Sequence, residues 1–149
     1  AQISNDNFPI NLHVTDPYSK DHPGKIDTPL GDYVKMASSW PNQIFILAHL
    51  GGLIPLREQS KDLNLILKNV YFDCAAIPLL YESAKIHEMA EKIGIEKILF
   101  GSDYPLRSFP REQKEHGFVR SINFVEGSGL TDKQLKLVFS TNAKRLFSI

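Results

Sequence analysis

The chain has 149 residues, with 17 basic side chains against 17 acidic ones, one cysteine and a hydrophobic content of 42%. This length suits one domain or part of one, and the balanced charge offers no basic surface to a nucleic acid or an anionic membrane. Cys74 is the only cysteine, no apolar run reaches the roughly 20 residues of a bilayer span, and the polar opening does not resemble a signal peptide. We therefore expect a cytoplasmic protein.

The first segments predict a strand followed by a long loop. Strand-like sequence at Ile10–Val14 begins close to Ala1, which is not a methionine. We therefore expect either that an amino-terminal portion has been removed or that the chain is a fragment of a larger fold. The polar loop over residues 15–28 is longer than a simple connection requires, which is typical of binding loops. Tyr18 and His22 in this loop are candidate substrate contacts.

The next segments predict a helix and a second strand–helix unit. Apolar residues at helical spacing indicate a helix from Leu30 to Trp40, with the tryptophan in the core. The wholly apolar stretch Ile44–Ala48 is typical of a parallel strand covered on both faces, and it ends in His49. Gly51 and Gly52 then allow a sharp turn, after which we expect a helix over residues 53–67.

The third and fourth units follow the same order. We expect a strand at Val70–Asp73, with Asp73 capping the turn that follows, and a helix over residues 79–93 closed by Gly94. A short apolar strand then runs through Gly101 and Ser102 to Asp103, and Pro105 ends it because proline has no backbone donor.

The carboxyl-terminal part predicts two more helices. The first covers residues 113–125, and the second begins at Thr131, where Gln134 completes a capping-box pattern. We expect the second helix to bury one apolar side, formed by Leu135, Val138, Phe139, Leu146 and Phe147.

Strands that alternate with helices predict an α/β fold in which four parallel strands are joined by right-handed crossovers. In such a fold His13, His49 and Asp103 all follow the carboxyl ends of strands and can meet at one edge. Imidazoles and a carboxylate are the ligands of a catalytic divalent metal such as Zn²⁺, which takes three protein ligands and a water. Such a metal lowers the pKa of its water from 15.7 to about 7, and a carboxylate beside it can take up the proton.

Several short segments together resemble the carboxyl-terminal half of a (β/α)8 TIM barrel of the amidohydrolase superfamily. The likeness is to the amidohydrolase-related branch, which includes metal-dependent hydrolases and aminocarboxymuconate-semialdehyde-type decarboxylases, and it covers nearly the whole chain. It implies that residues 1–149 form one partial domain with strands five to eight of the barrel. The segments that carry it are Asn11-Leu12-His13, residues 48–52, Val70–Asp73, residues 99–105 and residues 142–147.

The resemblance also implies roles for individual residues. His13 would be the metal ligand of the fifth strand, and Asp103 the ligand and proton-transfer group of the eighth strand. His49 would be a second-metal ligand in two-metal members and a catalytic histidine in one-metal members. The metal would be Zn²⁺, with Mn²⁺ as the alternative. No His-x-His pair, which supplies two ligands from the first strand of such barrels, occurs in the 149 residues, so weak or absent metal occupancy is expected.

Three functions remain open from the sequence. The first is a metal-dependent hydrolase that acts on a C–N, C–O or lactone bond of a small-molecule substrate. The second is a nonoxidative decarboxylase of the same family. The third is an inactive half-barrel that serves as a structural or interaction module. Arg107, just beyond the Pro105 turn, could bind a substrate carboxylate or could be a surface charge. Because four strands leave two open edges, we also expect self-association or pairing with the missing half-barrel.

Overall fold

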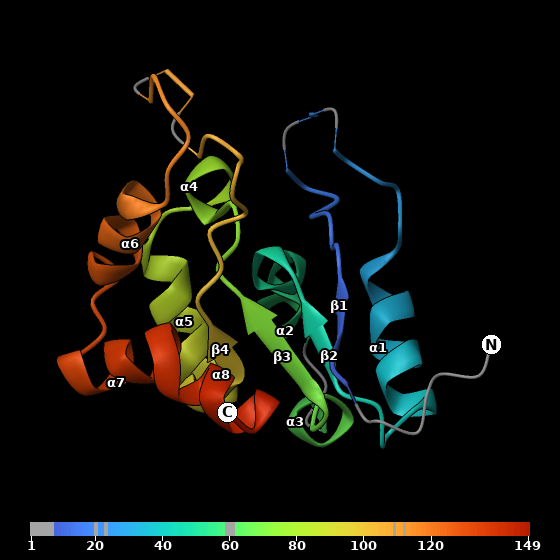
Figure 1. Ribbon diagram of the computed structural model, residues 1–149. Helices are drawn as coiled ribbons and strands as arrows, with labels where there is room; N and C mark the ends of the chain where they lie inside the picture. Colours follow the sequence, from blue (N-terminus) through green and yellow to red (C-terminus); the bar gives the residue numbers. More distant parts are fainter. Residues whose placement is uncertain (1–7, 20, 23, 59–61, 109, 112) are drawn as a thin grey trace.

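The computed structural model describes residues 8–19, 21–22, 24–58, 62–108, 110–111 and 113–149. Its strands form one parallel sheet in the order β1-β2-β3-β4, so neighbours in the sheet are also neighbours along the chain (Figure 1). This confirms the predicted α/β fold with four parallel strands. The strands are β1 (Ile10–Leu12), β2 (Phe45–Leu47), β3 (Val70–Asp73) and β4 (Ile98–Leu99).

Helices follow each strand and lie around the sheet. In Figure 1, α1 lies beside β1 at one end of the sheet, and α8 lies beside β4 at the other end, with α6 and α7 farther out on that side. Short 3-10 turns occupy residues 49–53 and 95–97, and a π-turn occupies residues 137–141. The α-helices are α1 (Leu30–Ser39), α2 (Ile54–Arg57), α3 (Leu63–Ile66), α4 (Ile77–Leu80), α5 (Ala84–Ile93), α6 (Val119–Glu126), α7 (Asp132–Lys136) and α8 (Asn142–Phe147).

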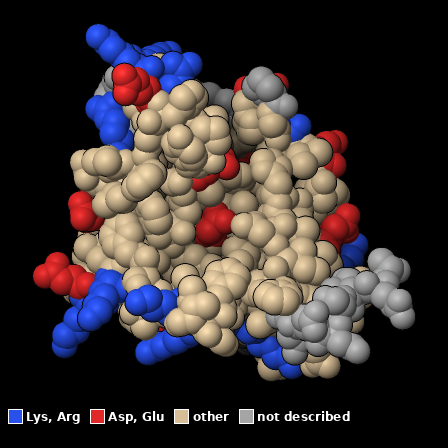
Figure 2. All heavy atoms as spheres, viewed as in Figure 1, with Lys and Arg blue, Asp and Glu red and all other residues tan. Residues whose placement is uncertain are grey.

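The two faces of the sheet have different surroundings. Side chains alternate along each strand, and residues in register across parallel strands share a face. One face belongs to the main hydrophobic core, where Leu47, Phe72 and Ile98 are in register and almost fully buried. On the opposite face, Asn11 is exposed and Tyr71 is half-buried. In Figure 2, Lys and Arg gather at the periphery, and the centre of the view is uncharged apart from a few Asp or Glu side chains.

The structure corrects two of the predicted helices in the middle of the chain. Residues 53–67 do not form one helix, because Glu58 has an extended backbone that ends α2, and α3 begins only at Leu63. The predicted helix over residues 79–93 is also divided. Tyr81 is extended and separates α4 from α5, which ends at Gly94 as predicted.

Further corrections concern the carboxyl-terminal helices and the core. The helix predicted over residues 113–125 begins only at Val119. The capping box of Thr131 and Gln134 is confirmed, and Val138 is fully buried. Trp40 and Phe147 are 46% and 44% exposed, so neither belongs to the core, since each stands at or near the end of its helix.

None of the helices in the described ranges is long and apolar enough to cross a membrane. The longest of them, α1 and α5, each have 10 residues.

Candidate active site

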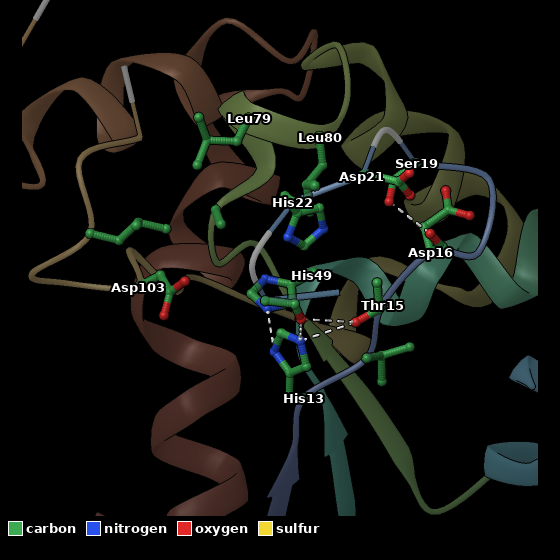
Figure 3. A pocket seen from close by; sticks show the side chains of 14 residues that line it. His13, Thr15, Asp16, Ser19, Asp21, His22, His49, Leu79, Leu80 and Asp103 are labelled. Carbon is green, nitrogen blue, oxygen red and sulfur yellow. Dashed lines mark hydrogen bonds between the residues drawn. The ribbon is translucent and has the colours of Figure 1, made fainter. Parts of the chain in front are cut away.

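Two histidines from neighbouring strands meet at the carboxyl edge of the sheet. His13 follows β1 and His49 follows β2, and Nδ1 of His13 lies 3.0 Å from Nε2 of His49. The two rings are nearly perpendicular, at 80°, with their centroids 4.9 Å apart (Figure 3). The predicted convergence of these two residues is therefore present in the structure.

An unusual turn positions the ring of His49. The backbone from His49 to Leu53 has positive φ at every residue, between 52° and 60°. Gly51 and Gly52 adopt this conformation easily, whereas it costs roughly 1–2 kcal/mol for each other residue. A Cβ on Gly51 would lie 2.7 Å from the ring of Phe72, so the turn also packs directly on β3.

Asp73, at the end of β3, holds this turn in place. Its Oδ1 accepts hydrogen bonds from the backbone N–H of His49 at 3.1 Å and from that of Ala75 at 3.0 Å. The predicted capping of the following turn is thus confirmed, and it extends to the neighbouring strand. Burial raises the pKa of Asp73, while the two backbone hydrogen bonds act in the opposite direction. The carboxylate therefore fixes the backbone from which the His49 ring projects.

The outer nitrogen of each histidine contacts a backbone carbonyl. Nδ1 of His49 lies 2.8 Å from the carbonyl of Ala75, and Nε2 of His13 lies 3.0 Å from that of Gly24. Because a carbonyl can only accept a hydrogen bond, both of these nitrogens carry the proton in neutral rings. The lone pairs of the two remaining nitrogens then face each other across 3.0 Å. Such a pair is complementary to a proton or a cation between the rings.

A cavity of about 710 Å³ opens over the histidine pair (Figure 3). One wall is apolar and comes from α4 and the segment after β4, and another is polar and comes from the loop after β1. The apolar wall contains Ala76, Leu79, Leu80 and Leu106, and the polar wall contains Thr15, Asp16, Ser19, Asp21 and His22. The predicted substrate contact His22 therefore lies at the same cavity as the histidines.

Asp103 lines this cavity but does not complete a metal site. Within the described part of the chain, no group of three or more His, Cys, Asp or Glu side chains could hold a metal ion. The three ligands predicted from the sequence are thus not assembled around one point. Asp103 follows β4 and His13 follows β1, the two outer strands of the described sheet, so the curvature of the sheet sets the distance between them.

Two predicted substrate contacts lie away from this cavity. Tyr18 is 76% exposed, and its ring lies under the guanidinium of Arg57 at 4.5 Å, beside a second and smaller groove. Its backbone N–H donates to Oδ1 of Asp16, which turns the chain outward at this point. Arg107 is exposed, and its neighbour Leu106 lines the cavity instead.

An ion pair that no sequence pattern predicted lies behind the polar wall. Asp16 accepts hydrogen bonds from Nη2 of Arg57 at 2.6 Å and from the hydroxyl of Tyr81 at 2.9 Å, and its side chain is 3% exposed. Burial raises the pKa of Tyr81, and the adjacent Asp16 carboxylate raises it further. An acidic residue in a polar loop is normally predicted to be exposed to solvent. The partners of Asp16 come from distant parts of the chain and become apparent only in the folded structure.

Comparisons with known proteins find the same architecture. A family described as amidohydrolase has a model that matches residues 7–149. No curated protein matches the chain. Among solved structures, 2,6-dihydroxybenzoate decarboxylase from Rhizobium is 16% identical with a TM-score of 0.63, and 95% of this chain aligns with 51% of that one.

Two further solved structures are similar over a smaller part. The 5-carboxyvanillate decarboxylase from Sphingomonas paucimobilis is 17% identical with a TM-score of 0.62. A dihydroxybenzoic acid decarboxylase from Polaromonas, with bound manganese and an inhibitor, is 15% identical with a TM-score of 0.62. In both, 80% of this chain aligns with 39% of the other. The chain thus spans about two fifths to one half of these structures, as expected for half of a (β/α)8 barrel.

Proposed function

The chain belongs to the amidohydrolase family, and on that basis we propose that it supplies half of the active site of a metal-dependent decarboxylase for small carboxylic acids. The observation that carries this proposal is the pair of imidazole lone pairs that face each other at 3.0 Å beneath a partly apolar cavity. The names of the similar solved structures, which are decarboxylases, give it further support.

The histidine pair fits a divalent metal. Two nitrogens bound to one tetrahedral Zn²⁺ at about 2.0–2.1 Å lie roughly 3.3 Å apart, close to the separation of His13 Nδ1 and His49 Nε2. Metal-binding histidines typically donate their other N–H to a carbonyl or carboxylate, and both of these contact carbonyls. Mn²⁺ stands ahead of Zn²⁺ in the proposal, because manganese is bound in the Polaromonas enzyme. The metal would supply a Lewis acid that holds and polarises an oxygen of the substrate.

The other residues of the cavity have separate roles in the proposed reaction. The apolar wall of Leu79, Leu80 and Leu106 would hold the carbon skeleton and disfavour the charged carboxylate relative to neutral carbon dioxide. When the bond to the carboxylate breaks, its electron pair stays on the substrate carbon, which then takes a proton. Asp103 is the proposed source of that proton.

A hydrolase remains the second candidate. Asp103 is exposed as well as lining the cavity, so water reaches it, and a carboxylate there could equally take a proton from an attacking water. The bond cleaved would then be a C–N, C–O or lactone bond.

The proposal also includes a second half of the site. Strands β1 and β4 end the described sheet, and a metal needs more ligands than the two imidazoles. We propose that four further strands, in the same polypeptide or in a partner chain, close the barrel and provide these ligands.

Metal content and product analysis of the protein expressed from its complete reading frame test this function. We expect bound Mn²⁺ or Zn²⁺ by elemental analysis and carbon dioxide release from one or more aromatic carboxylates. His49→Gln should lose both, whereas His87→Gln, at a half-buried position of α5 that does not line the cavity, should retain both. Hydrolysis without carbon dioxide release would favour the second candidate. A folded protein that binds neither Mn²⁺ nor Zn²⁺ would contradict both the decarboxylase and the hydrolase. The structural or interaction module would then be the function that stays open.

A further inference from the structure

We propose that Arg57 is a positioning residue that clamps together the two turns from which His13 and His49 project. This inference rests on the proposed function, since it concerns the same histidine pair. It adds a residue outside the cavity that sets the distance between the two imidazoles.

Arg57, at the end of α2, bonds to both turns at once. Its Nη2 donates to Oδ2 of Asp16 at 2.6 Å, and its Nε donates to the carbonyl of Gly52 at 3.1 Å. Asp16 stands three residues after His13, and Gly52 stands three residues after His49. The planar guanidinium therefore connects equivalent points of the two chain segments that follow β1 and β2. A fixed fork of donors suits this role better than a flexible ammonium would.

The clamp is held in a largely buried setting. The Asp16 side chain is 3% exposed and that of Arg57 is 35% exposed, so solvent screens the pair little on the acidic side. The hydroxyl of Tyr81 and the backbone N–H of Tyr18 donate to the same carboxylate. Each Asp16 oxygen thus has a donor, which fixes the carboxylate in one orientation.

The clamp reaches both rings through the backbone. On the side of His13, the loop that Asp16 anchors also carries Thr15 and the carbonyl of Gly24, both in contact with Nε2 of His13. On the side of His49, the carbonyl of Gly52 belongs to the left-handed turn that begins at His49 itself. Without Arg57, the two segments would keep the strand pairing that ends at Leu12 and Ala48 but would lose this bridge beyond the histidines. The 3.0 Å approach of the facing nitrogens would then be held less firmly.

A second ion pair shows what distinguishes this one and provides a control. Lys85 and Glu88 are also 2.6 Å apart, but both belong to α5, and their side chains are 38% and 45% exposed. That pair connects no separate segments. Lys85→Met therefore removes a cation and its ion pair without affecting the histidines.

The test compares Arg57→Met and Asp16→Asn/Arg57→Met with wild type and Lys85→Met in the protein expressed from its complete reading frame. The double variant avoids leaving a buried carboxylate without its cation, so it should fold even if the single variant does not. A third clamp variant, Asp16→Asn alone, weakens the ion pair from the acidic side. Its amide oxygen can still accept the hydrogen bond from the N–H of Tyr18. The first measurement is the nuclear Overhauser effect between the ring protons of His13 and His49 in metal-free, folded protein. The second is the equilibrium Kd for Mn²⁺ by chelator competition.

We expect the ring-to-ring Overhauser effect to weaken strongly in the clamp variants, and their Mn²⁺ affinity to fall about tenfold or more, with both unchanged in Lys85→Met. A role in stability alone would lower the midpoint of unfolding but leave the Overhauser effect of the folded protein intact, which would overturn the inference. If wild type binds no metal and the ring contact still depends on Arg57, the proposed function fails and the clamp stands. If wild type binds Mn²⁺ and the clamp variants bind it equally well, the clamp fails and the function stands.

Discussion

Replacing Asp73 tests whether its carboxylate holds the His49 turn as the structure indicates. Oδ1 of Asp73 is the acceptor for two buried backbone donors, the N–H groups of His49 and Ala75. Asp73→Ala leaves both N–H groups without this acceptor, and an unsatisfied buried donor costs about 1–3 kcal/mol. Removing a carboxylate whose pKa is raised by burial offsets part of this loss. We therefore expect Asp73→Ala to lower the free energy of unfolding by about 2–4 kcal/mol.

Asp73→Asn is the matched variant, because its amide oxygen can accept the same two hydrogen bonds. A neutral amide also avoids the cost of a buried charge, so we expect its free energy of unfolding to stay within about 1 kcal/mol of wild type. Asp27→Ala, on an exposed loop position, serves as the control and should change stability by less than about 0.5 kcal/mol. Urea denaturation followed by circular dichroism measures all three. Equal losses in the alanine and asparagine variants would refute the hydrogen-bonding argument.

Three other predictions follow from the fold. Gly51→Ala should destabilise the protein by about 1–3 kcal/mol in urea denaturation, because Gly51 has a positive φ and a Cβ there would collide with the ring of Phe72. Gly31→Ala in α1 should be neutral or stabilising, because no atom lies near the added Cβ. Burial raises the pKa of Tyr81, so folding favours the protonated phenol, and the free energy of unfolding should fall as the pH rises above the ordinary pKa of 10.0. This fall should be less steep in Tyr81→Phe, as measured by unfolding across this pH range. Light scattering of the 149-residue chain alone should show association, and a compact monomer would contradict the open half-barrel.

The sequence was sufficient for the strands because their signal is local. Strands β2 and β4 are wholly apolar, and β1 and β3 are mostly apolar. Polar residues that bear on the chemistry follow closely, as with His49 two residues after Leu47. Helix lengths were harder to predict, since apolar periodicity continued across breaks in the backbone. Tyr81 fits the pattern of a continuous helix, but its side chain bonds to Asp16, and its backbone is extended.

In the candidate site, too, only some of the contacts could be predicted from the sequence. His13 and His49 could be predicted as neighbours because they follow strands that are adjacent in the sheet. Asp103 follows the strand at the far end, so its distance from His13 depends on the curvature of the sheet, which no local pattern encodes. Asp16 and Arg57 lie far apart in the sequence, and neither belongs to a recognisable motif. Contacts of this kind emerge only from the packed structure.

The left-handed turn after β2 has a consequence for any attempt to transplant this site. Three of its five residues, His49, Leu50 and Leu53, are not glycine, so the conformation costs at least about 3 kcal/mol in isolation. A synthetic peptide with this sequence would revert to right-handed backbone and present its imidazole in another direction. The useful orientation of His49 is therefore a property of the assembled scaffold, and an engineered copy would have to include the neighbouring strand and its aspartate.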